Sequence, residues 1–280
     1  MREHADQPQL IPQWTKLPKG ERWEGRKRPI ILANGRSYSW KTGESYTDRE
    51  VAVVSCNEKN IEGVCGSLSA EIVTFYDMRV RDLSVLAEIK GLRRLVIDWN
   101  TKAVSLAPLA ALKDLEVLSL THTPKVTDLA PIAKIDGLRS FEFEGGNTVS
   151  SPNTADSLEP IGELDRLEEL ALSNLTVRHG GLRPIALCRS LKRLALPINF
   201  LTEDYAFLAA KLPDTKCRCF AGVIELDQWS FDINGRPIKQ KPDTMIVGRR
   251  KPILHSVRDA ERIQKYRAQF EALKAEFAAG

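Results

Sequence analysis

The chain has 280 residues, of which 42% are hydrophobic and 28% are charged, and its formal net charge at pH 7 is +4. These values are ordinary for a folded soluble protein, and no uninterrupted apolar run approaches the ~18 residues that a membrane helix needs. The first residues lack the apolar core of a signal peptide, and the five cysteines have no disulfide-framework spacing. We therefore expect a cytoplasmic protein with no membrane partner.

Residues 1–68 are expected to form an N-terminal extension followed by capping strands. Residues 1–28 are polar, contain three prolines and show no period, so we expect extended chain there. Residues 28–40 contain an Asn-Gly dipeptide between apolar segments, which favours a β-hairpin with a two-residue type I′ turn. Residues 51–54 are apolar and predict a further strand. Such strands would cap a repeat domain, whose first unit otherwise exposes an apolar end.

An apolar motif recurs every 23 to 24 residues, with one longer interval, between residue 69 and about residue 220. It places apolar residues at the first, fourth and sixth positions, as in Leu92-x-x-Leu95-x-Ile97. A period in this range is typical of a solenoid, whose units cannot bury their apolar faces alone. We count the first position of each motif as offset zero. The units then begin at residues 69, 92, 115, 138, 167 and 191, and a partial unit follows near residue 214.

Each unit also carries a second apolar stretch after the strand and its turn. A spacing of i, i+3 and i+6 suits a 3₁₀ helix or a short α-helix on the convex side. It occurs in three units, as Leu83, Leu86 and Ile89, as Leu106, Leu109 and Leu112, and as Leu129, Ile132 and Ile135. The fold predicted for residues 69–220 is therefore an α/β solenoid.

These units resemble the leucine-rich repeat family. The sequences Ser-Leu-Ala-Pro-Leu at 105–109 and Asp-Leu-Ala-Pro-Ile at 128–132 are similar to its internalin-type subclass. The resemblance covers roughly residues 69–220, and it implies a horseshoe with parallel strands on the concave face and protein recognition as the usual role. The asparagine that the family carries at offset eight is kept only as Asn100 and Asn199. Other residues take that place in the remaining units, namely Asp77, Thr123, Gly146 and Leu175.

The unit that begins at Leu138 is longer than its neighbours. Its extra residues fall within residues 145–157, which are rich in Gly, Ser, Asn and Thr and predict a loop. Insertions in repeat proteins map to loops, often on a binding face. Two interpretations stay open, a loop that contributes to binding and a tolerated surface insertion.

Residues 221–280 are expected to form a C-terminal cap. Residues 229–238 contain a second Asn-Gly dipeptide and predict another hairpin. Ser256 and Asp259 resemble a helix N-cap with its acidic partner three residues on, and the helix is expected to run to about Ala278. Its apolar stripe, which we expect to dock on the last turn of the solenoid, consists of Ile263, Tyr266, Phe270, Leu273 and Phe277.

The concave surface can be mapped from the offsets, because side chains alternate along a strand and equal offsets of adjacent parallel strands lie about 4.8 Å apart. Offset seven gives a row of aromatic side chains, and offsets four and six give carboxylates with no obvious cationic neighbour. The candidate partner-binding residues are Phe75, Tyr76, Asp98, Trp99, His122, Glu142 and Glu144. Two further acids are expected to be neutralised, Glu71 by Arg94 and Glu169 by Arg193.

Exposed Trp and Tyr side chains dominate binding hot spots, and flanking carboxylates suit a basic partner surface. The predicted partner is therefore a protein with a basic surface. The alternative is that the N-terminal cap folds over Tyr76 and Trp99, in which case these residues belong to the core.

No motif for chemistry is present. The sequence lacks a phosphate-binding loop, a His-Glu-x-x-His motif, a nucleophile elbow and a dinucleotide fingerprint, and its four histidines have no metal-ligand spacing. Cys217 and Cys219 occupy inward ladder offsets and are expected to be core residues. We therefore expect no catalytic residue, no metal and no cofactor. The basic cluster within residues 249–267 has no interleaved aromatic residues and favours a solvated helix face over a nucleic-acid partner.

These features predict a non-catalytic protein-interaction module that binds a protein through its concave face. A more specific hypothesis is a cytoplasmic inhibitor or immunity-type protein that neutralises a basic toxin or enzyme. The alternatives are a structural subunit of a larger assembly and an enzyme with an unrecognised site in the cap regions.

Overall fold

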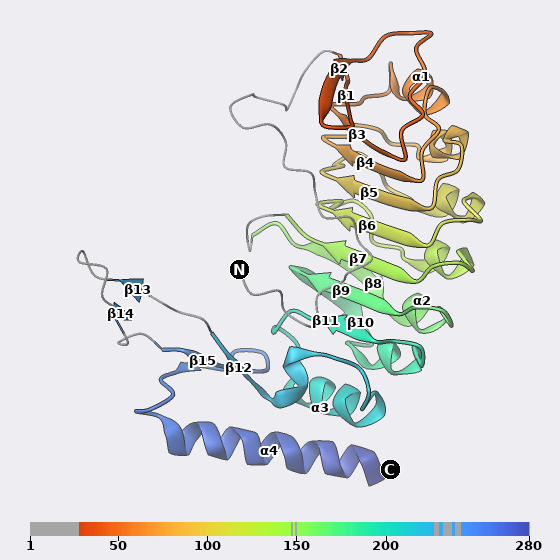
Figure 1. Cartoon of the computed structure of the whole chain (residues 1–280). Helices are drawn as coiled ribbons and strands as arrows, with labels where there is room; N and C mark the ends of the chain where they lie inside the picture. The colour runs from red at the N-terminus through yellow and green to blue at the C-terminus, as the bar shows by residue number, and fades with distance from the viewer. Residues whose placement is uncertain are drawn as a thin grey trace.

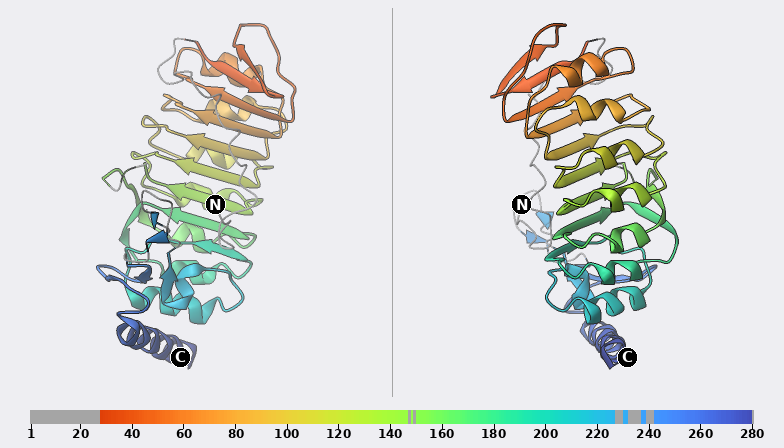
Figure 2. Two further views of the ribbon diagram at one scale, coloured as in Figure 1. Left: turned by 60° about the vertical axis from the view of Figure 1, so that its left-hand side comes forward. Right: turned by 90° about the vertical axis from the view of Figure 1, so that its right-hand side faces the viewer.

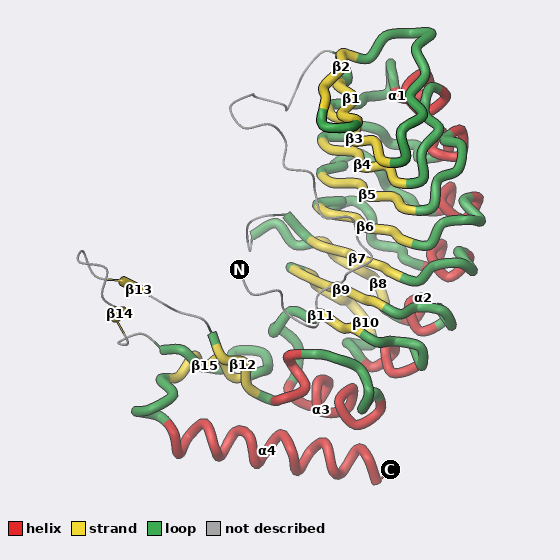
Figure 3. The backbone as a smooth tube through the Cα atoms, viewed as in Figure 1, coloured by secondary structure: helices red, strands yellow, loops and turns green. Residues whose placement is uncertain are grey.

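The computed structural model describes residues 28–279 except residues 147, 149, 227–229, 232–236 and 239–241. Most of the extended segment predicted for residues 1–28 therefore lies outside the described residues. Within them, a nine-stranded sheet runs along an elongated molecule, in the order β11-β9-β7-β6-β5-β4-β3-β1-β2 (Figure 1). Short helices lie on the side opposite the strands (Figures 2 and 3).

The N-terminal end of the sheet is a hairpin of β1 (Ile30–Ala33) and β2 (Arg36–Ser39), which pair antiparallel. Its turn residues Asn34 and Gly35 have φ angles of 48° and 71°, as a type I′ turn requires. Strand β1 also pairs antiparallel with β3 (Glu50–Val54), which joins the hairpin to the repeats. The predicted hairpin and the predicted strand after it are confirmed.

The repeats contribute parallel strands that form one ladder. These are β4 (Ile72–Tyr76), β5 (Arg94–Asp98), β6 (Val117–Thr121), β7 (Ser140–Glu144), β9 (Glu169–Ser173) and β11 (Arg193–Ala195). The convex side carries short helices, which are α1 (Ile61–Gly66), η1 (Ser84–Glu88), η2 (Ala107–Ala111), η3 (Ala130–Lys134), α2 (Glu159–Gly162) and η4 (Arg183–Leu187). This is the α/β solenoid that the leucine spacing predicts.

The core lies between the strands and the short helices. The ladder side chains of Leu95, Leu118 and Leu170 are fully buried, as are Leu86 and Leu109 from the convex stretches. Each unit buries these side chains only against its neighbours, so stacking supplies most of the apolar burial.

Asparagine side chains satisfy the backbone groups of the turns that follow the strands. Asn100 is fully buried. Its amide nitrogen donates to the carbonyl of Val80 at 3.0 Å, and its amide oxygen accepts from the N–H groups of Lys102 and Ala103 at 2.9 and 3.0 Å. These bonds pair three backbone groups of the turns, each of which would cost about 1–3 kcal/mol if it were buried without a partner.

The register of the first predicted unit is wrong by one residue. Val73 lies opposite Leu95 and Phe75 lies opposite Ile97, so this unit begins at residue 70 and not at residue 69. Phe75 is therefore a ladder residue with no exposed surface. The interval to Leu92 is one residue shorter than the regular spacing, and a one-residue shift exchanges the inward and outward faces of a strand.

The repetitive part of the fold also begins one unit earlier than the leucine motif indicates. Strand β3 pairs parallel with β4, with Val51 and Val53 opposite Val73 and Phe75, and α1 packs beside η1 on the convex side. Val51 and Val53 are fully buried. Valine replaces leucine in this unit, which removed the signal that marks the others.

The insertion is not entirely a loop, contrary to the prediction for residues 145–157. Its last five residues form β8 (Asn153–Ser157), which pairs parallel with β10 (Leu175–His179) in a separate two-stranded sheet. The polar composition concealed this strand because Asn153 and Ala155 point inward and are fully buried. Only residues 145–152 form the connection from β7.

The C-terminal cap begins with α3 (Thr202–Lys211) and η5 (Arg218–Ala221), which follow the last repeat. A three-stranded sheet then combines β12 (Val223–Glu225), β15 (Thr244–Ile246) and β16 (Ile253–Leu254). Between its strands, β13 (Ser230–Phe231) and β14 (Pro237–Ile238) pair antiparallel, as the predicted hairpin requires. The Asn-Gly turn itself lies outside the described residues.

The chain closes with the long helix α4 (Ala260–Ala279), which packs against α3 (Figure 1). Ile263 and Phe270 of the predicted stripe are buried, and Tyr266, Leu273 and Phe277 are partly buried against the core. The predicted cap is wrong, because the hydroxyl of Ser256 donates to Asp243 at 2.6 Å and the helix begins four residues later.

Alternating charges run along one edge of the solenoid at offset one, immediately before each strand. In chain order the row is Arg49, Glu71, Arg93, Glu116, Arg139, Glu168 and Lys192. Ion pairs join Arg49 to Glu71 and Arg139 to Glu168, both at 2.8 Å, and Lys192 to Glu168 at 2.6 Å. Arg93 also pairs with Glu116. Because the charge at offset one changes sign from each unit to the next, every neighbouring pair in the row attracts. The row therefore favours stacking of the units in this register.

Leu118→Ala should lower the free energy of unfolding by about 2–5 kcal/mol, because it opens a cavity in a close-packed core. The control is Val104→Ala, since Val104 is 46% exposed and its truncation should change the free energy by less than about 0.5 kcal/mol. Urea denaturation of both variants would check this. Equal midpoints for the two variants would contradict the ladder assignment.

Glu168→Gln should lower the free energy of unfolding by up to about 1 kcal/mol at low salt, because it leaves Arg139 and Lys192 facing each other without a carboxylate. The loss should shrink in about 1 M NaCl, which screens exposed charges. Unfolding midpoints at the two salt concentrations measure it, with Glu163→Gln as a control outside the row. A loss that does not depend on salt would show that the row acts by packing.

Candidate binding surface

Six of the seven predicted residues lie on or beside the outer face of β4 to β7. Phe75 is the exception, because the corrected register turns it into the core. The same correction places Tyr76 opposite Asp98, at offset six, and not in a row with Trp99. We call the remaining six residues the concave patch, which consists of Tyr76, Asp98, Trp99, His122, Glu142 and Glu144.

Three consecutive units have a left-handed backbone conformation at offset seven. Asp77, Trp99 and His122 have φ angles of 54°, 69° and 51°, whereas Gly145, at the same offset in the next unit, does not have a positive φ. The backbone of each unit leaves its strand at this offset. The N–H of the offset-seven residue donates to a carbonyl of the neighbouring strand, as Trp99 does to the carbonyl of Thr121 at 2.9 Å. A tryptophan at positive φ is unusual and is held only where the surroundings fix it.

The Trp99 and His122 rings stack on each other at the end of β5 and β6. Their centroids lie 4.3 Å apart with a tilt of 44° between the planes. Trp99 keeps 38% of its surface exposed, so it is not part of the core. Burial lowers the pKa of His122, which favours a neutral imidazole in the stack.

Tyr76 has a different environment from Trp99. It packs, partly buried, against the cluster of Ile30 and Val54 in the N-terminal strands. The N-terminal strands therefore cover part of Tyr76, as the alternative interpretation predicted. They do not cover Trp99, which remains exposed.

The three carboxylates of the patch lie close enough to influence one another. Burial, followed by the charge of Glu144, raises the pKa of Asp98 to about 6. Burial also raises the pKa of Glu142 and Glu144, although hydrogen bonds from Ser119 and Ser173 oppose the rise. Among the described residues no Lys or Arg forms an ion pair with any of the three, so the cluster holds uncompensated negative charge.

Other predicted acids are paired with cations. Arg193 donates to Glu169 at 3.2 Å, as predicted, and the Ser140 hydroxyl donates to the same carboxylate at 3.3 Å. Glu71 lies 4.0 Å from Arg94, but its stronger partner is Arg49, which the sequence reasoning missed because β3 had not been placed beside β4.

The sequence reasoning also missed Asn153 and Asn174, which border the patch. Asn153 is fully buried and its amide nitrogen donates to the carbonyl of Glu144 at 2.7 Å. Asn174 stands at offset seven and binds the residues that follow β7. Asn153 lies within the polar insertion, where the regular offsets no longer apply, so its inward position could not be read from the repeat pattern.

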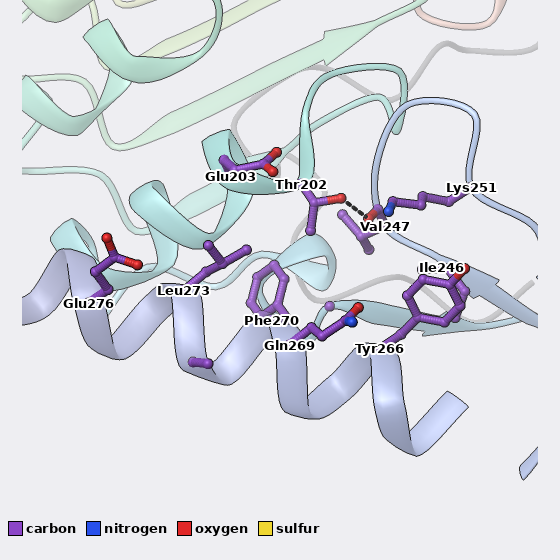
Figure 4. Close-up of a pocket in the computed structure, with 12 residues that line it drawn as sticks. Thr202, Glu203, Ile246, Val247, Lys251, Tyr266, Gln269, Phe270, Leu273 and Glu276 are labelled. Carbon is purple, nitrogen blue, oxygen red and sulfur yellow. Dashed lines mark hydrogen bonds between the residues drawn. The ribbon is translucent and has the colours of Figure 1, made fainter. Parts of the chain in front are cut away.

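A groove of about 390 Å³ lies between α3 and α4, away from the patch (Figure 4). Phe270, Leu273 and Ile246 line it together with Glu203 and Lys251, and its polar groups do not converge on one point (Figure 4). In the described part of the chain, no three His, Cys, Asp or Glu side chains are grouped to hold a metal ion. None of the described helices has both the length and the apolar character to cross a bilayer.

Asp98→Asn should remove a pH dependence of stability between about pH 4 and pH 6. Because the folded pKa is raised, the folded state binds the proton more tightly than the unfolded chain. The wild-type protein should therefore be more stable near pH 4.5 than near pH 7 as far as this group is concerned, with a loss on the order of 1–3 kcal/mol as the pH rises through about 6. Asp98→Asn should be more stable than wild type at pH 7.

Urea denaturation across this pH range measures the effect, with Asp136→Asn as a control at an exposed carboxylate. A wild-type and an Asp98→Asn profile that run parallel would show that Asp98 titrates alike in the folded and unfolded chains.

No protein-family model and no curated protein matches the chain. Among solved structures, an internalin from Listeria monocytogenes is similar over 57% of this chain and 44% of its own, with 18% identity and a TM-score of 0.43. Internalin C2 from the same organism is 18% identical over 61% of this chain and 70% of its own, with a TM-score of 0.42. A leucine-rich-repeat protein of Leptospira interrogans is 19% identical over 58% of this chain and 51% of its own, with a TM-score of 0.39.

The chain spans less than half the length of the first of these proteins, and at this similarity the likeness concerns the fold alone. The repeat geometry within the chain is the stronger observation. Parallel strands in register and buried apolar ladders recur from unit to unit, and asparagine side chains bond the turns at Asn100 and Asn199. On that geometry, the chain has the leucine-rich-repeat fold.

Proposed function

We propose that this chain is a non-catalytic protein-interaction module that binds a protein partner through the concave patch. The observation that carries the proposal is the exposed Trp99, stacked on His122 beside Asp98, Glu142 and Glu144. A large exposed aromatic side chain with fixed geometry is the usual centre of a binding hot spot.

The charge of the patch favours a basic partner. Burial raises the pKa of all three carboxylates, and repulsion by a neighbouring carboxylate raises the pKa of Asp98 and Glu142 further. A partner's Lys or Arg side chain would relieve that repulsion, and its aliphatic stem or guanidinium plane would pack against the ring of Trp99. A nucleic acid, in contrast, would bring phosphates against three carboxylates.

A preformed surface of this kind suits a protein that occupies the working face of another. We propose that the partner is a basic toxin or enzyme and that this chain acts in the cytoplasm as its inhibitor or immunity-type protein. The support is the combination of negative charge and apolar area on one face of a rigid solenoid, which gives electrostatic steering together with a low entropic cost of binding.

Affinity co-purification from a lysate of the source cells tests the proposal, with wild type compared with a Trp99→Ala, Glu142→Lys, Glu144→Lys variant. We expect a stoichiometric basic protein with wild type and its loss with the variant. A Leu187→Ala, Glu163→Lys variant is the matched control, because both residues are exposed on the convex side. Thermal unfolding should show that both variants remain folded.

Equal recovery of the partner with wild type and the patch variant would refute the concave patch as the binding site. Loss of the partner with the control variant alone would move the interface to the convex side.

A further inference from the structure

The segment of residues 145–152 is anchored at its two ends. At its start, the N–H of Gly145 donates to the carbonyl of Ser173 at 3.0 Å. At its end, the N–H of Asn153 donates to the carbonyl of Asn174 at 3.1 Å, and its side chain donates to the carbonyl of Glu144 at 2.7 Å. The two ends are therefore joined to each other and to the next unit.

Between these ends, the carbonyl groups of Gly146, Thr148 and Ser151 surround one side chain. The amide nitrogen of Asn174 lies 2.8 Å from the carbonyl oxygens of Gly146 and Thr148 and 3.2 Å from that of Ser151. An amide has two N–H groups, so three converging carbonyls share them. Backbone bonds from Gly146 to Ser151 and from Ser151 to Thr148, at 2.7 and 2.9 Å, close the same turn.

Two glycines allow the segment to approach its neighbours this closely. A Cβ at Gly145 would lie 2.8 Å from the backbone nitrogen of Asn153 and would collide with the carbonyl of Asn174. A Cβ at Gly146 would collide with Nδ1 of His122 and lie 2.9 Å from its Cε1. The backbone of Gly146 therefore packs directly on the imidazole of His122.

This contact continues into the concave patch. Gly146 lies against the Nδ1 and Cε1 atoms of His122, and the imidazole ring stacks on Trp99. His122 Nδ1 is buried and has no hydrogen-bond partner among the described residues, so Gly146 contacts this nitrogen by packing alone. Asn174 therefore holds Gly146 by a hydrogen bond, Gly146 packs on His122, and His122 packs on Trp99.

We propose that residues 145, 146, 148 and 150–152 form a built wall of the concave patch and that Asn174 is a positioning residue, which holds Gly146 against His122 and so fixes Trp99 in its stacked, exposed orientation. This inference rests on the proposed function, which gives the orientation of Trp99 its purpose. A surface insertion that is merely tolerated has no need of three carbonyl oxygens around the amide of Asn174. It also has no need of a glycine packed on the ring of His122 in another unit. A fixed aromatic anchor binds with less loss of side-chain entropy than a mobile one.

Asn174→Ala tests the proposal by NMR of the full chain, without a partner. In wild type the His122 ring protons should be shifted upfield by the Trp99 ring and should show cross-relaxation with the indole protons. In Asn174→Ala we expect more than half of that shift to be lost and the cross-relaxation to weaken. The His122 signals are assigned with His122→Gln.

Asn199→Ala is the matched control, because Asn199 also donates its amide to a backbone carbonyl, that of Leu175 at 3.0 Å, in a neighbouring unit. It should change thermal stability but leave the His122 signals in place. A second variant, Gly146→Ala, leaves Asn174 intact and should displace the His122 ring directly. This variant decides the matter if Asn174→Ala does not fold.

Unchanged His122 shifts in a folded Asn174→Ala, or in a folded Gly146→Ala, would overturn the proposal. The NMR result does not depend on any partner. A partner that binds equally to wild type and to Trp99→Ala would refute the proposed function, whereas intact stacking in Asn174→Ala would refute the positioning role alone.

Discussion

The structure depends on one constraint, which is that no repeat unit can bury its own apolar residues. A strand of five residues with a short helix behind it has too little core, so each unit gains stability only by stacking on the next. Stacking in turn requires every strand to keep one register, because a one-residue slip would bring inward side chains to the surface. The corrected first unit follows this rule, since Phe75 and not Thr74 aligns with Ile97.

Other features follow from the need to hold that register. The turns that leave the strands are closed by buried asparagines such as Asn100 and Asn153, which pair backbone groups that the sheet cannot reach. Alternating charges at offset one favour the same alignment on the solvent side. After β5 and β6 the offset-seven residue has a positive φ, which directs Trp99 and His122 out of the core at one level of the sheet.

The candidate patch arises where this regular pattern is interrupted. The insertion after β7 adds a second short sheet and an anchored segment beside His122, so the concave face is not uniform along its length. Carboxylates accumulate on β5 and β7 next to that segment, while acids elsewhere, such as Glu71 and Glu169, have cationic partners. The surface is therefore most distinctive in charge and shape at the same place, which supports a binding role there.

The sequence alone determined the solenoid, the ladder strands of the repeats from Leu92 onward, the two hairpins and the capping helix, because apolar periodicity and turn dipeptides are local signals. It also identified Trp99, Asp98, Glu142 and Glu144 as outward-facing, since alternation along a strand needs no tertiary information. Only the tertiary structure decided that Phe75 is core, that Tyr76 packs on the N-terminal strands, that Arg49 reaches Glu71, and that Asn174 gathers the insertion against His122. Each of these depends on which unit lies beside which and at what register, and that is fixed by packing between segments distant in the sequence.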